Sequence, residues 1–91
     1  MLRPPSAAAL DRLAHAATGT DRELDRALCD VGVLPPLDLN QIRRVLQRRG
    51  TRLAMSRNDD GHTIVQVVWN AQLAALVHHD GRVQMLGIAA A

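Results

Sequence analysis

The spacing of apolar residues changes at Thr51, and this change constrains the fold more than any other feature. Before it, apolar residues recur every three or four positions, as in amphipathic helices. After it they alternate, and the turn signals NDDG at 58–61, NA at 70–71 and DG at 80–81 separate four short strands. The pattern predicts an α+β fold: three N-terminal helices followed by a four-stranded antiparallel β-meander, forming one small domain over 1–91.

Helix-capping residues support the three predicted helices. The first helix is expected over about residues 7–17. The second begins at a capping box of Thr20 and Glu23, and the third at a capping box of Asp38 and Gln41. In each of these two helices the next glycine along the chain supplies the C-terminal stop. Local sequence therefore defines the helical half of the domain without reference to its packing.

The single cysteine and the hydropathy pattern bear on location. Cys29 is alone, so an intrachain disulfide is excluded, and a lone thiol within a helix is expected to be a small buried hydrophobe in a reducing compartment. The sequence shows neither the apolar run of a signal peptide nor a stretch long enough to span a bilayer. We expect a cytoplasmic protein with no membrane role.

One stretch, NQIRRVLQRRGTRLAMSR at 40–57, holds six arginines and no acidic residue, although the whole chain is only +2. Lysine is absent, which favours planar, bidentate contacts with phosphate or carboxylate. Biased nucleotide composition explains the arginines equally well, and a solvated helix face is the plain structural alternative. The functional interpretation is an anion-binding surface made of the following residues: Arg43, Arg44 and Arg48, extended by Arg52 and Arg57.

Nucleic acid is the first candidate partner of this surface. Three helices followed by a hairpin resemble the element order of winged helix-turn-helix domains, in which the third helix enters the major groove. The chain departs from that pattern in its long GVLPPLD connection and in Asp59 and Asp60 at the expected wing tip, which phosphate would repel. An acidic protein surface is the second candidate. We expect a small, non-enzymatic, regulatory binding protein.

The histidines raise two further possibilities. Two-residue turns and a four-residue NDDG loop would place His62 beside His79, but the rest of that row is cationic, so no metal site and no cofactor are expected. The order helix, glycine, strand, turn and Gly-His over residues 42 to 68 is similar to HicA-type RNA-cleaving toxins. Those proteins usually show Gly-Ser-His and continue into a helix, whereas this chain reads DGHT and continues into strand. No catalytic constellation is expected.

Both faces of the predicted sheet are apolar under the same register. One face is expected to receive the helices, and it comprises Leu53, Met55, Ile64, Val68, Leu73, Val77, Leu86 and Ile88. The other is too apolar to face water, which predicts self-association or docking of a protein partner. The alternative is that one helix crosses to cover it. The predicted interface residues on this second face are Val65, Val67, Trp69, Leu76 and Met85.

Overall fold

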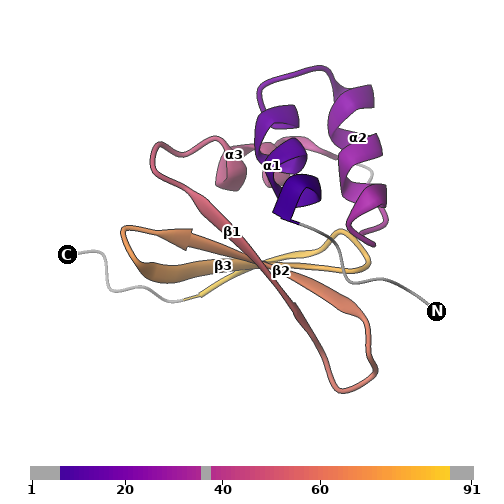
Figure 1. Ribbon diagram of the computed structural model, residues 1–91, viewed down its shortest axis with the longest axis vertical. Coiled ribbons are helices and arrows are strands. Elements are labelled where there is room, and N and C mark those ends of the chain that lie inside the picture. The colour runs from indigo at the N-terminus through magenta and orange to yellow at the C-terminus, as the bar shows by residue number, and fades with distance from the viewer. Residues whose placement is uncertain (1–6, 36–37, 87–91) are drawn as a thin grey trace.

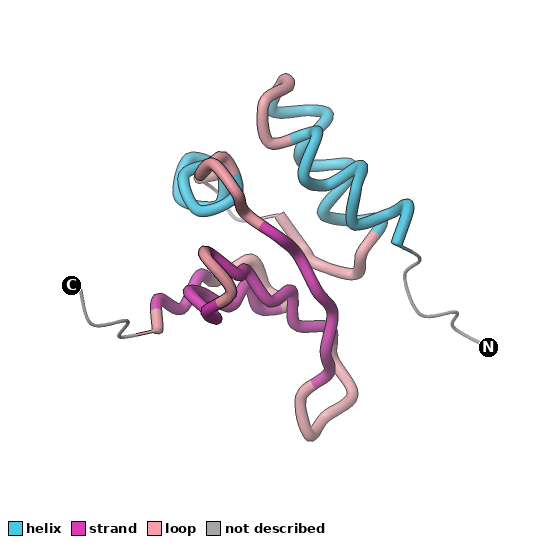
Figure 2. Tube along the Cα trace, turned by 60° about the vertical axis from the view of Figure 1, so that its left-hand side comes forward, coloured by secondary structure: helices cyan, strands magenta, loops and turns pink. Residues whose placement is uncertain are grey.

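The fold is a layer of three helices on one side of a four-stranded antiparallel sheet (Figures 1 and 2). The computed structural model describes residues 7–35 and 38–86. Its elements are α1 (Ala7–Ala16), α2 (Asp21–Asp30), α3 (Asn40–Leu46), β1 (Arg52–Arg57), β2 (Thr63–Trp69), β3 (Gln72–His78) and β4 (Val83–Met85). Neighbours in the sheet follow the order β1-β2-β3-β4. The predicted class and the order of helices before meander are confirmed.

Helix α2 begins and ends at the predicted capping residues, but the Glu23 carboxylate accepts a hydrogen bond from the Thr20 hydroxyl at 3.2 Å and not from the Thr20 backbone N–H, as a full capping box requires. The Thr20 hydroxyl accepts a hydrogen bond from the backbone N–H of Glu23 at 3.2 Å, which satisfies one of the free donors of the first turn. At the other end, Gly32 adopts φ +86°, and the N–H of Val33 donates to the Leu28 carbonyl at 2.9 Å. A positive φ is readily adopted by glycine, so Gly32 ends the helix as expected.

Helix α3 differs from its prediction at both ends. It begins after Leu39, which provides no side-chain cap, and Asp38 instead accepts a hydrogen bond from the N–H of Asn40 at 2.9 Å. The predicted capping box with Gln41 is therefore wrong by one position. The helix ends at Leu46, before the turn that contains Gly50, and so it has only 7 residues. A helix this short depends on packing for its stability.

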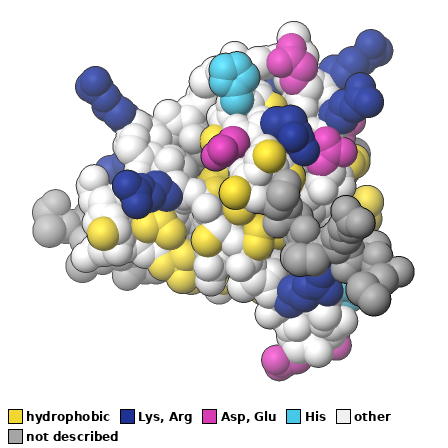
Figure 3. All heavy atoms as spheres, in the orientation of Figure 1, with side chains coloured by type: hydrophobic (Ala, Val, Ile, Leu, Met, Phe, Trp, Pro, Cys, Tyr) yellow, Lys and Arg dark blue, Asp and Glu magenta, His cyan; other side chains and the backbone are white. Residues whose placement is uncertain are grey.

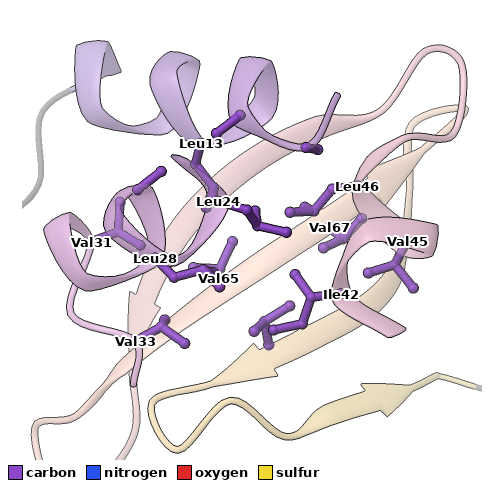
Figure 4. Packing of buried hydrophobic residues seen from close by; sticks show 14 of the residues in the cluster. Leu13, Leu24, Leu28, Val31, Val33, Ile42, Val45, Leu46, Val65 and Val67 are labelled. Carbon is purple, nitrogen blue, oxygen red and sulfur yellow. The ribbon is translucent and has the colours of Figure 1, made fainter. Parts of the chain in front are cut away.

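The core lies between the helices and the facing side of the sheet (Figure 4). It is aliphatic, as expected from a composition with a single aromatic residue. The largest fully buried side chains are Leu13, Leu24, Leu28, Val31, Val33, Ile42, Val65, Val67 and Val77. Trp69 is only partly buried and packs at the margin of this cluster.

The strand registers differ from the predicted ones by a single residue in each hairpin. In β1–β2, Arg57 pairs with Thr63 because the loop spans 58–62, where the Asn58 side chain accepts from the N–H groups of Asp60 and His62, each at 2.9 Å. The β2–β3 turn at 70–71 is as predicted, but a bulge between Val67 and Val68 shifts the rest of the pairing. The β3–β4 register is also shifted by one residue.

These shifts overturn the predicted division of the sheet faces. Val65 and Val67 are each 0% exposed and lie beneath the helices, so the prediction that they form a protein interface is wrong. Trp69 lies on the same helix-covered face. Met85 also belongs to this face, because it pairs with the buried Ala75, but it lies on the edge strand β4. Leu76 alone of the predicted interface residues lies on the opposite face. Because side chains alternate, a one-residue shift exchanges the faces of a strand.

Two remaining expectations concern Cys29 and the chain's relation to membranes. The Cys29 thiol is exposed, so the prediction that it is a buried hydrophobe is wrong. The periodicity of α2 explains the difference, since Leu24, Ala27 and Leu28 occupy its buried face and leave Cys29 beside them on the outer side. Within the described residues, none of the helices combines the length and apolar character that crossing a membrane requires.

The β3–β4 turn contains a carboxylate held by the backbone. Asp80 accepts a hydrogen bond from the N–H of Arg82 at 3.0 Å. This bond is the main cause that lowers the pKa of Asp80 below its ordinary value of 3.8. Desolvation opposes the shift, and the charges of Arg82 and His79 lower the pKa further. The turn is therefore better formed with Asp80 ionised.

Asp80→Asn is expected to remove a small, acid-sensitive part of the stability. Because the folded-state pKa is lowered, the contribution of the carboxylate is present above the unfolded-state pKa and is lost as the pH falls through the folded-state pKa. The difference in urea-unfolding free energy between wild type and variant should thus be larger near neutral pH than at acid pH below the folded-state pKa of Asp80. An NMR titration of the Asp80 carboxyl with a midpoint at or above 3.8 would contradict the assignment.

Candidate functional site

Arg43 is a structural residue that joins α3 to the loop between α1 and α2. Its guanidinium donates hydrogen bonds to the carbonyls of Ala17 and Gly19, each at 2.8 Å, and to the Asp21 carboxylate at 2.6 Å. Its side chain is 16% exposed. The sequence placed Arg43 in the anion-binding set, but the structure commits its donors to backbone oxygens and an acid within the domain. Arg43 is thus not free to bind an external anion.

The remaining arginines of α3, of the turn after it and of the start of β1 face solvent. Arg44, Arg48, Arg49 and Arg52 are all exposed, and none of them forms an ion pair within residues 7–35 and 38–86. We call this set the 44–52 arginines. In Figure 3 the arginines of the whole described chain project at separate points around the visible face rather than as one block. Because its four members lie within nine residues, the 44–52 set offers several cationic contacts along a short segment.

Arg48 is held in place by Trp69. Its guanidinium carbon lies 4.3 Å from the ring centroid, a cation–π contact. The indole N–H in turn donates to the Val45 carbonyl at 3.2 Å, which fixes the ring against α3. Within the described residues the Arg48 guanidinium donates no hydrogen bond, so its N–H groups remain available to a ligand. Trp69, predicted as a docking residue, thus supports the orientation of a cation.

Arg57 lies apart from the other arginines, at the opposite end of β1. Six strand residues separate the ends by roughly 17 Å at the usual rise, so Arg52 and Arg57 do not share one contact. Arg57 instead lines a pocket of about 370 Å³ near the end of α2, together with Asp30, His62 and His79. The predicted anion-binding set therefore does not form one surface. Arg43 is hydrogen-bonded within the domain, the 44–52 arginines are exposed, and Arg57 lies at the other end of β1.

The two histidines come together despite the register error. The rings of His62 and His79 stack with centroids 4.0 Å apart. Asp30 is the acidic residue in the pocket lining, and no group of three histidine, cysteine or acidic side chains suited to a metal ion occurs in the described part of the chain. The Nδ1 atom of His79 is buried without a hydrogen-bond partner. The pair marks the end of the sheet at which the 58–62 loop meets the β3–β4 turn.

No described element covers the sheet face turned away from the helices, and we call it the outer face. Alternation from the buried Val65 and Val67 assigns Ile64, Gln66 and Val68 to it, and the register brings Ala54, Leu73 and Leu76 beside them. Figures 1 and 2 show no described element against this side. Leu73 is 39% exposed, and the other four apolar residues are half-buried. The predicted alternative of a helix crossing to the far face is not observed.

Sequence reasoning missed most of the outer face. Ile64, Val68 and Leu73 were assigned to the core, because the predicted register grouped them with Leu53 and Met55. The sequence contains one relevant signal: the side chain of Asn58 can hold a five-residue loop by accepting two backbone N–H groups, as it does here. Counting the loop as 58–62 would have assigned β1 and β2 to the correct faces.

Comparison with known proteins adds no further information about the site. No protein-family model, curated protein or solved structure matches the chain. The fold and the exposed surfaces define a small two-layer α+β domain with a segment of unpaired arginines and one uncovered sheet face. Any function must therefore be inferred from these two surfaces.

Proposed function

We propose that the chain is a small non-enzymatic regulatory protein that binds the phosphate backbone of nucleic acid through the 44–52 arginines. The observation that carries the proposal is that four exposed guanidinium groups occur within nine residues and lack an acidic partner in the described structure. Adjacent cations repel one another, and a polyanion relieves this repulsion while releasing its own counterions.

The Arg48–Trp69 contact supports this proposal. An arginine held against a ring has lost part of its side-chain freedom before it meets a ligand, so less entropy is lost on binding. Its planar edge can then donate two parallel hydrogen bonds to a phosphate. Phosphate is favoured over carboxylate here because a nucleic acid presents a phosphate at regular intervals, which suits several separate cations.

The structure favours contact with the phosphate backbone of the nucleic acid over recognition of base edges by α3. Helix α3 has 7 residues, of which Ile42, Val45 and Leu46 are buried, and Arg43 is committed to the neighbouring loop. Such a helix has little exposed surface with which to enter a major groove. Asp59 and Asp60 are exposed in the β1–β2 loop, which argues against a wing that touches phosphate. We therefore expect binding that is independent of base sequence.

Charge reversal tests the proposal. Arg44→Glu with Arg48→Glu should reduce affinity for a labelled duplex at least about tenfold, and fluorescence anisotropy measures this. For wild type, the affinity should fall by about 100-fold between 50 and 200 mM salt if four phosphates are contacted. Arg22→Glu with Arg26→Glu is the matched control, since it makes the same charge change on exposed residues of α2 and should affect affinity much less.

Two outcomes would contradict the proposal. In one, both double variants lose affinity equally, which means that net charge and not the 44–52 segment determines binding. In the other, wild type binds poly-glutamate with an affinity that depends on Arg44 and Arg48 but does not bind duplex or single-stranded nucleic acid. That second result would assign the arginines to an acidic protein surface instead.

A further inference from the structure

The outer face has a composition that restricts its partner. On the two central strands its side chains are Ile64, Gln66, Val68, Leu73, Leu76 and His78, a set with no acidic residue, arginine or lysine. A partner that presents charge would leave that charge buried and unpaired against this surface. Its complement is therefore a surface that is itself apolar and uncharged.

We propose that this complement is the outer face of a second copy of the chain, so that two sheets pack face to face about a two-fold axis near Gln66. A side-chain amide carries both a donor and an acceptor, so two copies of Gln66 related by such an axis satisfy each other. Among the described residues, Arg52 is the one arginine on the face, and it lies on the edge strand β1, where like charges stay solvated at the rim.

The area of the face determines the strength expected of this dimer. Four strands at the usual spacing are about 19 Å wide, and the paired rows extend about 20 Å, so each copy contributes roughly 400 Å². The total of about 800 Å² is below the standard size of a stable interface. We therefore expect a weak dimer that forms at high micromolar concentration and dissociates on dilution. Apart from Arg52 at its rim, the face contains none of the 44–52 arginines, and the inference does not depend on nucleic-acid binding.

Sedimentation velocity across a concentration series tests the inference. Wild type should move from the mass of one 9.9 kDa chain toward twice that value as concentration rises from about 10 µM to about 1 mM. Leu76→Glu should remain monomeric throughout, since a charge would be buried at the interface. Leu34→Glu is the control, because Leu34 is 65% exposed but lies in the connection after α2, and this variant should dimerise like wild type.

Chemical crosslinking tests the geometry separately. Sheets that pack face to face lie about 10 Å apart, which is too far for a direct disulfide but within reach of a short, flexible bismaleimide. In a Cys29→Ser background, this reagent should crosslink Gln66→Cys to a covalent dimer much faster than Ala14→Cys, an exposed position on α1. Equal rates for the two cysteines, or a wild-type chain that stays monomeric over the whole series, would overturn the proposal. Loss of association by Leu34→Glu with retention by Leu76→Glu would also overturn it.

Discussion

The Val67→Arg variant is expected to be unfolded at room temperature, whereas Gln66→Arg one position earlier should fold normally. Val67 is 0% exposed beneath the helices, so arginine there removes a packed side chain and buries an unpaired charge. The loss should be at least about 4 kcal/mol, comparable with the whole stability of a small domain. Gln66 faces the other way, and its substitution should change the free energy of unfolding by less than about 1 kcal/mol.

Circular dichroism and urea unfolding of dilute protein measure this contrast. The same Gln66→Arg variant should also abolish the proposed self-association, because it places like charges together at the two-fold axis. A folded Val67→Arg chain beside an unfolded Gln66→Arg chain would show that the helices cover the opposite face, and both the fold and the proposed interface would then be wrong.

The second large effect is expected at Arg43. Arg43→Met keeps much of the aliphatic side chain but removes the donors to the Ala17 and Gly19 carbonyls, each now at 2.8 Å. Hydrogen bonds from charged groups to partly buried acceptors are among the stronger ones, so the variant should lose about 2–4 kcal/mol of unfolding free energy. Arg44→Met is the control, since Arg44 is exposed and makes no such contact, and should change stability by less than about 0.5 kcal/mol.

The carboxylate partner of Arg43 should matter much less than the carbonyls. Asp21 is 78% exposed, and ion pairs with solvent-exposed groups contribute little, so Asp21→Asn should cost less than about 1 kcal/mol. Chemical denaturation measures all three variants, and hydrogen exchange should show the loss from Arg43→Met concentrated at the α1–α2 loop. Equal destabilisation by the Arg43 and Arg44 variants would contradict the structural role of Arg43.

The helix signals that proved reliable are those that act within a few residues. The capping of α2 by Thr20 and its end at Gly32 follow from contacts three to five positions apart, which the sequence displays directly. The same logic was wrong at α3, where Asp38 bonds to Asn40 and the helix starts one residue later. Local preferences there are weak, and packing of Ile42, Val45 and Leu46 decides where the helix lies.

For the arginine stretch, the sequence predicted the exposure of most side chains but not the long-range contacts of two of them. Charge and spacing indicate a cationic segment, and the exposure of the 44–52 arginines agrees with that expectation. The sequence does not indicate that Arg43 meets carbonyls 24 and 26 positions earlier, or that β1 carries Arg57 to a separate pocket. Those contacts exist only after the helices have packed on the sheet, because they join residues distant along the chain.

The sequence by itself determined the types and order of the elements, where along the chain the three turns fall and the presence of apolar residues on both sheet faces. It did not determine the lengths of the first and third turns. Tertiary structure decided which face the helices cover, because that choice depends on register. An extra residue in the 58–62 loop and a bulge between Val67 and Val68 each shift the pairing by one position. Since strand side chains alternate with a period of two, each shift exchanges inward and outward residues. The buried Val65 and Val67 and the open Ile64, Val68 and Leu76 are the result.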